Sequence, residues 1–177
     1  MTAFAPHTIG IPVNSGKDME VMKQMFDVCI LIKHISNFKD FLDTYEKIAI
    51  QEIKYCEISV DVDKVLEDTI KVSKNIASRG FYDKEEYQLY VNGIRSLKSH
   101  LFDNNYSSNV AAIEVTKILY LSACVLKRQP YKKLENIQRY LNNNFITKDF
   151  RALKYLKKID LEAYAYSIEA EKIIKNK

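Results

Sequence analysis

Residues 109–126 read Asn-Val-Ala-Ala-Ile-Glu-Val-Thr-Lys-Ile-Leu-Tyr-Leu-Ser-Ala-Cys-Val-Leu and form the most apolar stretch of the chain. In the first turns only Glu114, Thr116 and Lys117 interrupt the apolar residues. A helix of this composition is apolar on nearly every side, which is typical of a helix buried in a core. Glu114 and Lys117 lie three residues apart, so we expect them to form an ion pair on the one hydrated strip of this helix.

The same stretch is a poor candidate for a membrane span. A transmembrane helix needs about 20 predominantly apolar residues, whereas this stretch has eighteen residues and two charges. Before it, the sequence Asn-Asn-Tyr-Ser-Ser-Asn at 104–109 offers side chains that can cap a helix, and after it Pro130 ends the helix. We therefore interpret it as the central core helix of a protein with no membrane span.

Composition points to a single all-α domain. The chain has 177 residues, 47% hydrophobic and 28% charged, which suits one globular domain with a substantial core. Its four glycines and three prolines are too few for the many turns of a β protein. We expect one globular bundle of about eight helices around the buried apolar helix at 109–126, because every periodic segment after Lys17 fits a helical repeat better than an alternating one.

The periodicity divides the chain into an N-terminal arm and a helical domain. Residues 1–16 have no helical period and contain two prolines and two glycines, so we expect an extended arm. Residues 17–177 form the single all-helical domain. Its predicted helices lie at about 17–35, 37–56, 65–79, 83–101, 109–126, 130–142, 148–158 and 161–174.

Helix ends and one helix interior carry specific signals. Asn37 and Asp83 each precede an acidic residue by three positions, which is close to the spacing of a capping box. Gly80 follows a basic last turn and can adopt the left-handed conformation that ends a helix. Gly93 lies inside a regular helical pattern, where glycine costs about 1 kcal/mol of helix propensity. It therefore indicates close approach by another backbone.

The cysteines and the ends of the chain bear on its location. Cys29, Cys56 and Cys124 form no C-x-x-C motif, and each lies in an apolar helical pattern. We expect buried free thiols in a reducing compartment. Neither end carries the pattern of a secretory signal or a transit peptide. An intracellular location, cytoplasmic or nuclear, is therefore expected.

Catalytic and metal sites leave spacing signatures that this sequence lacks. His7, His34 and His100 are not accompanied by ligands at helical spacing, as E-x-x-H would require. The acidic run from Glu57 to Asp68 lacks the glycine and the third ligand of an EF-hand loop, and its aspartates suit helix capping. The sequence has no glycine-rich phosphate loop and no nucleophile motif. We expect no metal, no cofactor and no enzymatic activity.

Positive charge is concentrated in one segment. Residues 127–158 contain ten basic and two acidic residues, with aromatic residues between them. This pattern suits a surface that binds phosphates or acidic groups and stacks rings. Solvated helix faces with aromatics in the core would give the same pattern. The candidate binding residues are Lys132, Lys133, Arg139, Lys148, Arg151, Lys154, Lys158, Tyr131, Tyr140 and Tyr155.

The order of the predicted helices resembles that of one known family. An apolar fifth helix at the centre of eight, with Tyr140-Leu141-Asn142 after a sixth, is similar to the arrangement in Bcl-2-type proteins. The Asn-Trp-Gly-Arg signature of that family is replaced by Asn-Tyr-Ser-Ser at 105–108, the chain has no tryptophan, and its third helix is longer. The resemblance implies a protein that binds a partner helix in a groove.

These observations lead to a functional expectation. We expect a non-enzymatic helical protein that binds a protein partner or a second copy of itself, as an adaptor, assembly subunit or antagonist, through the basic surface at 127–158. Nucleic-acid binding through the same surface is the alternative, and no helix-turn-helix, RNP or KH signature decides between them. A Bcl-2-like groove binder is the weaker alternative.

Overall fold

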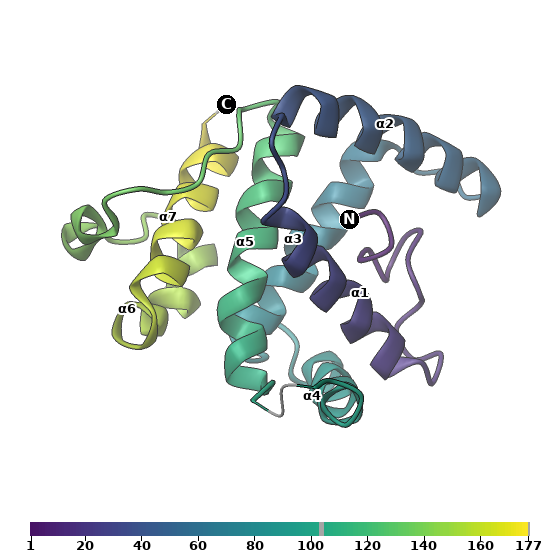
Figure 1. Cartoon of the computed structure of the whole chain (residues 1–177), viewed down its shortest axis with the longest axis horizontal. Coiled ribbons are helices and arrows are strands. Elements are labelled where there is room, and N and C mark those ends of the chain that lie inside the picture. The colour runs from purple at the N-terminus through teal and green to yellow at the C-terminus, as the bar shows by residue number, and fades with distance from the viewer. Residues whose placement is uncertain (103–104, 177) are drawn as a thin grey trace.

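The computed structural model describes residues 1–102 and 105–176. Within these residues the chain is all-helical, without strands, as predicted (Figure 1). The described residues contain eight separate helical segments when the 3-10 helix at 148–155 and the α-helix at 156–159, which are continuous, are taken together. The elements are α1 (Asp18–Ile32), α2 (Phe38–Tyr55), α3 (Val62–Ala77), α4 (Lys84–Lys98), α5 (Ser108–Leu126), the 3-10 helices η1 (Ile137–Asn142) and η2 (Lys148–Tyr155), α6 (Leu156–Ile159) and α7 (Leu161–Lys175).

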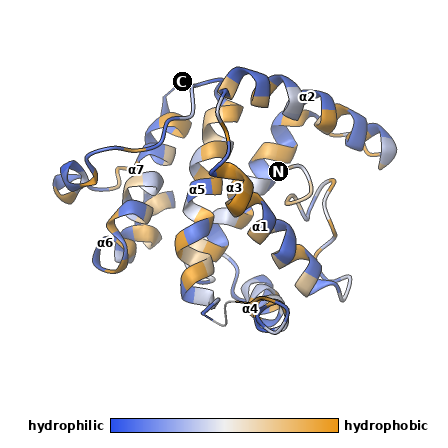
Figure 2. Cartoon of the chain, viewed as in Figure 1, coloured by the Kyte–Doolittle hydropathy of each residue, from blue (hydrophilic) through white to orange (hydrophobic). Residues whose placement is uncertain are grey.

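The predicted central helix is α5. It packs mainly against α3 and α7 and also contacts α1 and α4, and Figure 2 shows that most of its length is hydrophobic. Twelve of its 19 residues are buried. The Ser107 side chain caps it by accepting the N–H of Val110. The predicted ion pair is present, with 3.4 Å between Lys117 Nζ and Glu114 Oε1.

The composition of α5 also bears on membrane insertion. Among the described residues, α5 is the one helix that is long and apolar enough to cross a membrane. In this structure 67% of its most apolar window is buried. The core helix of a globular protein meets the same test of length and composition, so this property alone carries little weight.

The crossing of α1 and α4 explains the glycine inside α4. A Cβ atom placed on Gly93 would lie 2.1 Å from the carbonyl oxygen of Asp18 and 2.8 Å from Cγ of Met22. No side chain can be accommodated at the first of these distances, so the two helices can cross here only because position 93 is glycine. The close backbone approach predicted from the sequence is confirmed.

The predicted helix-end signals are also present. Asn37 accepts two N–H groups from the first turn of α2, and Asp83 accepts the N–H of Glu86 at 2.9 Å. Gly80 has a φ of +82° and donates its N–H to the carbonyl of Asn75 beyond the end of α3. These local hydrogen bonds fix where the helices begin and end.

The N-terminal arm is folded onto the helices. Its backbone turns instead of extending, because the N–H groups of Thr8 and Gly10 both donate to the carbonyl of Ala5. Phe4 and Ala5 are fully buried, and the hydroxyl of Thr69 on α3 donates to the carbonyl of Phe4. The arm is therefore an ordered part of the structure packed on α3.

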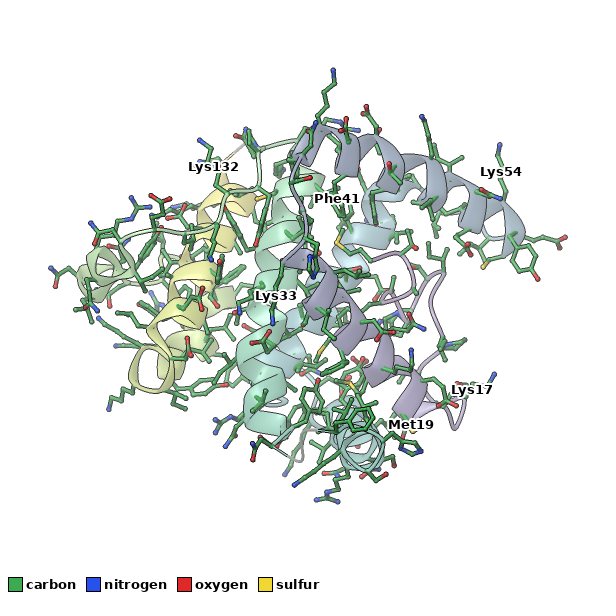
Figure 3. The ribbon with its side chains drawn as sticks, viewed as in Figure 1. Lys17, Met19, Lys33, Phe41, Lys54 and Lys132 are labelled. Atoms are coloured by element: carbon green, nitrogen blue, oxygen red, sulfur yellow. The ribbon has the colours of Figure 1, made fainter. Side chains whose placement is uncertain are left out.

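At the edge of the molecule lies α2. It packs mainly on α3 (Figure 1), and only Tyr45 and Ala49 are buried along it. Cys56 follows its last turn and is exposed, whereas Cys29 and Cys124 are buried. The prediction of a buried thiol at position 56 is wrong, because this end of α2 projects away from the other helices, as Lys54 shows in Figure 3.

Residues 127–158, which we call the basic segment, do not form the two helices predicted at 130–142 and 148–158. Residues 130–136 form no helix, and residues 137–142 and 148–155 are 3-10 helices. Phe150 and Leu153 in the second of these and Leu156, the first residue of α6, are all buried at a spacing of three residues. That spacing matches the 3.0 residues per turn of a 3-10 helix better than the 3.6 of an α-helix.

Candidate binding surface

The basic residues of η2 form a row on one face. Lys148, Arg151 and Lys154 repeat every three residues, in phase with the 3-10 helix, and all three are exposed. With three residues per turn and a rise of about 2.0 Å per residue, successive side chains start about 6 Å apart and are nearly eclipsed. The buried face of the same helix carries Phe150 and Leu153. We call Lys148, Arg151 and Lys154 the cationic row.

Contacts with α3 and the turn that follows it hold η2 in place. The ammonium of Lys74 lies 4.9 Å from the ring centre of Tyr82 and 5.0 Å from that of Phe150, and it pairs with the carboxylate of Asp149. The hydroxyl of Tyr155 donates to the carbonyl of Ala77 at 2.6 Å. These contacts use the other two faces of η2, so the cationic row remains in solvent.

Within the described residues, no carboxylate lies within 4.0 Å of any member of the cationic row. Asp149, the one acidic residue of η2, pairs with Lys74 instead. No described carboxylate therefore neutralises these three charges. An anionic partner could approach them without first displacing an internal ion pair.

The structure does not bring all predicted cations together. Lys132 and Lys133 lie on the irregular stretch after α5 and Lys158 lies on α6; all three are exposed, and Figure 3 shows Lys132 at the periphery. Arg139 on η1 is exposed but donates to the hydroxyl of Tyr140 and covers its ring at 4.9 Å. Both η1 and η2 pack against α7. The basic segment is thus a set of charges spread around α7, with one ordered row.

The three tyrosines predicted for the binding surface pack inward. Tyr140 is fully buried and donates to Glu169 on α7. Tyr131 is half-buried, and its ring lies 5.3 Å from that of Tyr120. Tyr155 is half-buried against α3. Their rings are not free to stack on bases, because in each case the apolar ring fills the contact between the basic segment and the core.

The basic segment is also anchored by a buried carboxylate that the sequence analysis did not identify. Glu171 on α7 is 2% exposed. It accepts the N–H of Ile146 at 3.0 Å, the N–H of Thr147 at 2.7 Å and the hydroxyl of Thr147 at 2.6 Å. Glu171 lies about 25 positions from Ile146 and Thr147 in the sequence, so no local pattern could have predicted these hydrogen bonds.

A second charged cluster fixes the N-terminal arm. His7 Nδ1 lies 2.6 Å from Asp68 on α3, and its Nε2 lies 2.8 Å from Glu86 on α4. Hydrogen bonds to Asp68 and then to Glu86 raise the pKa of His7 to about 9. No local sequence pattern indicates these two partners, because both lie more than 60 positions from His7.

Cys29 and Cys124 are buried, whereas His100 and Cys56 are exposed. Burial raises the pKa of Cys29 and Cys124 to about 12, which makes them poor nucleophiles. His100 is exposed at the end of α4 and contacts the carbonyl of Ser96. In the described part of the chain, no group of three or more histidine, cysteine or carboxylate side chains is arranged to hold a metal ion.

Two cavities have Lys33, the residue after α1, in their walls. The first, about 540 Å³, lies between α1 and the N-terminal part of α5 and has mostly apolar walls. The second, about 420 Å³, lies between the end of α1, α5, the basic segment and α7. The first is lined by Phe26, Cys29, Ile30, Lys33, Leu101, Phe102, Asn105, Tyr106, Val110 and Glu114. The charged residues of the second are Lys33, Lys117, Lys133 and Glu162.

Comparison with known proteins identifies no family for this chain. No family model, no curated protein and no solved structure gives a significant match.

Proposed function

We propose that this protein is a non-enzymatic binding protein whose cationic row docks an acidic helix of a protein partner. The observation that carries the proposal is the spacing of Lys148, Arg151 and Lys154 along η2, with no internal carboxylate partner among the described residues. The row places cations about 6 Å apart. Carboxylates at every fourth position of an α-helix also repeat about every 6 Å, because each residue rises about 1.5 Å.

The inward-packed tyrosines favour this partner over single-stranded nucleic acid. Proteins that bind single strands combine cations with aromatic side chains on which bases stack. Here Tyr140 is fully buried, and Tyr131 and Tyr155 are packed against other elements. The cationic row keeps its electrostatic attraction but lacks adjacent rings, which suits carboxylates better than bases.

Synthetic peptides can test the proposal. One alanine-rich helical peptide carries three glutamates at every fourth position, and a second has the same composition with the glutamates adjacent. Each well-placed exposed ion pair contributes about 0.2–1 kcal/mol, so we expect the spaced peptide to bind about tenfold more tightly. Equal binding of the two peptides would contradict a geometric match.

A charge-reversal variant locates the site. The combined variant Lys148→Glu, Arg151→Glu and Lys154→Glu should abolish binding of the spaced peptide, because it reverses the charges that would pair with the glutamates. All three side chains are exposed, so the fold should tolerate these changes. The matched control is the triple reversal of Lys39, Lys47 and Lys54, which are exposed on α2 and have no ion pair within the described residues. It makes the same change in net charge, so unchanged binding would exclude a purely long-range effect.

The same assay distinguishes a protein partner from the alternative, a single-stranded nucleic acid. If the three cations neutralise three phosphates of a single-stranded oligonucleotide, the logarithm of the binding constant should fall with the logarithm of the salt concentration at a slope of about −2. If it binds the protein and the spaced peptide does not, the basic segment is a nucleic-acid surface. If neither binds, the cationic row is a solvated helix face.

A further inference from the structure

The two cavities that share Lys33 differ sharply in their walls. Around the larger one, between α1 and α5, the side chains of Phe26, Ile30 and Val110 are apolar. Around the smaller one, three lysines from three different parts of the chain face a single carboxylate, Glu162. The larger cavity is thus mostly apolar and the smaller one carries more positive than negative charge, and Lys33, which Figure 3 labels, lines both.

One buried polar atom at this site has no hydrogen-bond partner among residues 1–102 and 105–176. The hydroxyl of Tyr106 is inaccessible to solvent and makes no hydrogen bond within the described residues. The residue as a whole is 6% exposed. Its ring is fixed edge-on against Phe26, with 5.2 Å between ring centres. Buried polar groups nearly always have a hydrogen-bond partner, so an orphaned hydroxyl in a cavity wall points to an absent acceptor.

The charges near this hydroxyl define its surroundings. Glu114 and Cys29 both lie close enough to raise the pKa of Tyr106, after the larger effect of burial. Glu114 is itself paired with Lys117 at 3.4 Å, and Lys117 also approaches Glu162 at 4.0 Å. Lys33 is exposed and, within the described residues, pairs with no carboxylate. Among the described residues that line the larger cavity, Lys33 therefore supplies an unpaired ammonium for an incoming anion.

We propose that this site binds a small amphiphilic carboxylate, with its apolar chain in the larger cavity and its carboxylate between Lys33 and the hydroxyl of Tyr106. A volume of about 540 Å³ is within the range of small-ligand sites. An apolar chain would cover Ile30, which is 42% exposed. The carboxylate would accept from the orphaned hydroxyl and pair with the unneutralised ammonium. This inference does not depend on the cationic row.

Calorimetry with dodecanoate, below its micellar concentration, tests the proposal. We expect saturable binding with one site per chain. Dodecyltrimethylammonium has the same apolar chain with the opposite charge and should bind about tenfold more weakly or not at all, because Lys33 would repel it. Absence of saturable dodecanoate binding, or equal binding of the two amphiphiles, would overturn the proposal.

Substitutions of side chains in the cavity wall locate the ligand. Lys33→Met should weaken dodecanoate binding about tenfold, and Ile30→Glu should weaken it at least as much by placing a charge in the apolar wall. Both positions are exposed, so the fold should tolerate these changes. Lys47→Met, an exposed lysine on α2, is the matched control and should bind as the parent does.

Tyr106→Phe separates a ligand contact from a structural role. It removes a hydroxyl that has no hydrogen-bond partner in the described part of the chain, so the melting temperature should stay the same or rise. Dodecanoate affinity should nevertheless fall by about threefold or more, as expected for a lost hydrogen bond of about 0.7 kcal/mol or more. Parent-like affinity in both Tyr106→Phe and Lys33→Met would show that the carboxylate does not lie here.

Discussion

Among the described residues, the N-terminal arm and the basic segment are the two longest parts without long α-helices, and in each a buried carboxylate of a core helix accepts hydrogen bonds. Asp68 on α3 accepts the backbone N–H of His7 at 2.8 Å and the hydroxyl of Thr8 at 3.0 Å. Glu171 on α7 accepts N–H groups and the hydroxyl of Thr147 in the basic segment. In both cases a carboxylate satisfies backbone donors that no helix satisfies.

The two segments differ in what they add to the core. The basic segment places large side chains in the main hydrophobic cluster, including Tyr140, Phe150 and Leu153. The arm contributes Phe4 to that cluster, while Ala5 and Ile9 belong to a small separate one. The basic segment is therefore part of the core with a charged exterior, whereas the arm is attached to a core that is largely complete without it.

The largest expected effect comes from removing the anchor of the basic segment. Glu171→Ala should lower the free energy of unfolding by about 2–4 kcal/mol, because several charge-assisted hydrogen bonds are lost and a buried side chain is truncated. Chemical denaturation measures it. The control Glu169→Ala lies on the same helix but is more exposed, and should lose about 1 kcal/mol. Equal losses would show that burial of Glu171 does not matter.

Removing the anchor of the arm should act more locally. Asp68→Ala should lower the free energy of unfolding by about 2 kcal/mol and speed amide hydrogen exchange in residues 1–16 while α5 stays protected. Glu67→Ala, an exposed neighbour on α3, should change stability by less than about 0.5 kcal/mol. Exchange that accelerates equally in the arm and in α5 would contradict the view that the arm is an attachment to a complete core.

The arm should also respond to pH through His7. Its pKa in the folded protein, about 9, is above the ordinary value of 6.5. The extra stability is therefore fully present below pH 6.5 and is lost as pH rises through 9. Because about a third of the side chain is exposed, we expect a loss of about 1–2 kcal/mol after allowance for solvent screening. The parent's free energy of unfolding, compared at pH 6 and pH 9.5 with that of His7→Gln, measures it; identical pH profiles would exclude the effect.

The smallest effect concerns the two threonine hydroxyls. Thr147→Val and Thr8→Val each remove one hydroxyl donated to an anchoring carboxylate and should each cost about 1 kcal/mol in unfolding free energy. Thr147→Val should cost slightly more, because its bond to Glu171 is 2.6 Å long and that of Thr8 to Asp68 is 3.0 Å. A larger loss for Thr8→Val would show that the hydroxyl bond in the N-terminal arm contributes more to stability than the one in the basic segment.

Features set by neighbouring residues could be predicted from the sequence. The apolar run at 109–126 identified the central helix, Asn37 and Asp83 marked helix starts, and Gly93 indicated a close helix crossing. In each case the physical cause lies within a few residues of the signal: periodic burial, a capping side chain or a missing Cβ.

Features that depend on distant partners could not be predicted. Nothing near His7 indicates that two carboxylates flank it, and nothing near Thr147 indicates Glu171. The tyrosines were ambiguous because a tyrosine has both a ring that packs and a hydroxyl that bonds, and only the fold shows which way each points. The period of three in Phe150, Leu153 and Leu156 was visible, but a stretch that short fits a 3.6 repeat almost as well.

The contact between Gly93 and Asp18 also limits how this protein can change. Clashes between side chains are often relieved by a second substitution that makes the opposing residue smaller. Here the opposing atom is the carbonyl oxygen of Asp18, which every amino acid carries, so no replacement at position 18 can make room. In a library that randomises both positions, we expect position 93 to return glycine alone among folded variants while position 18 varies.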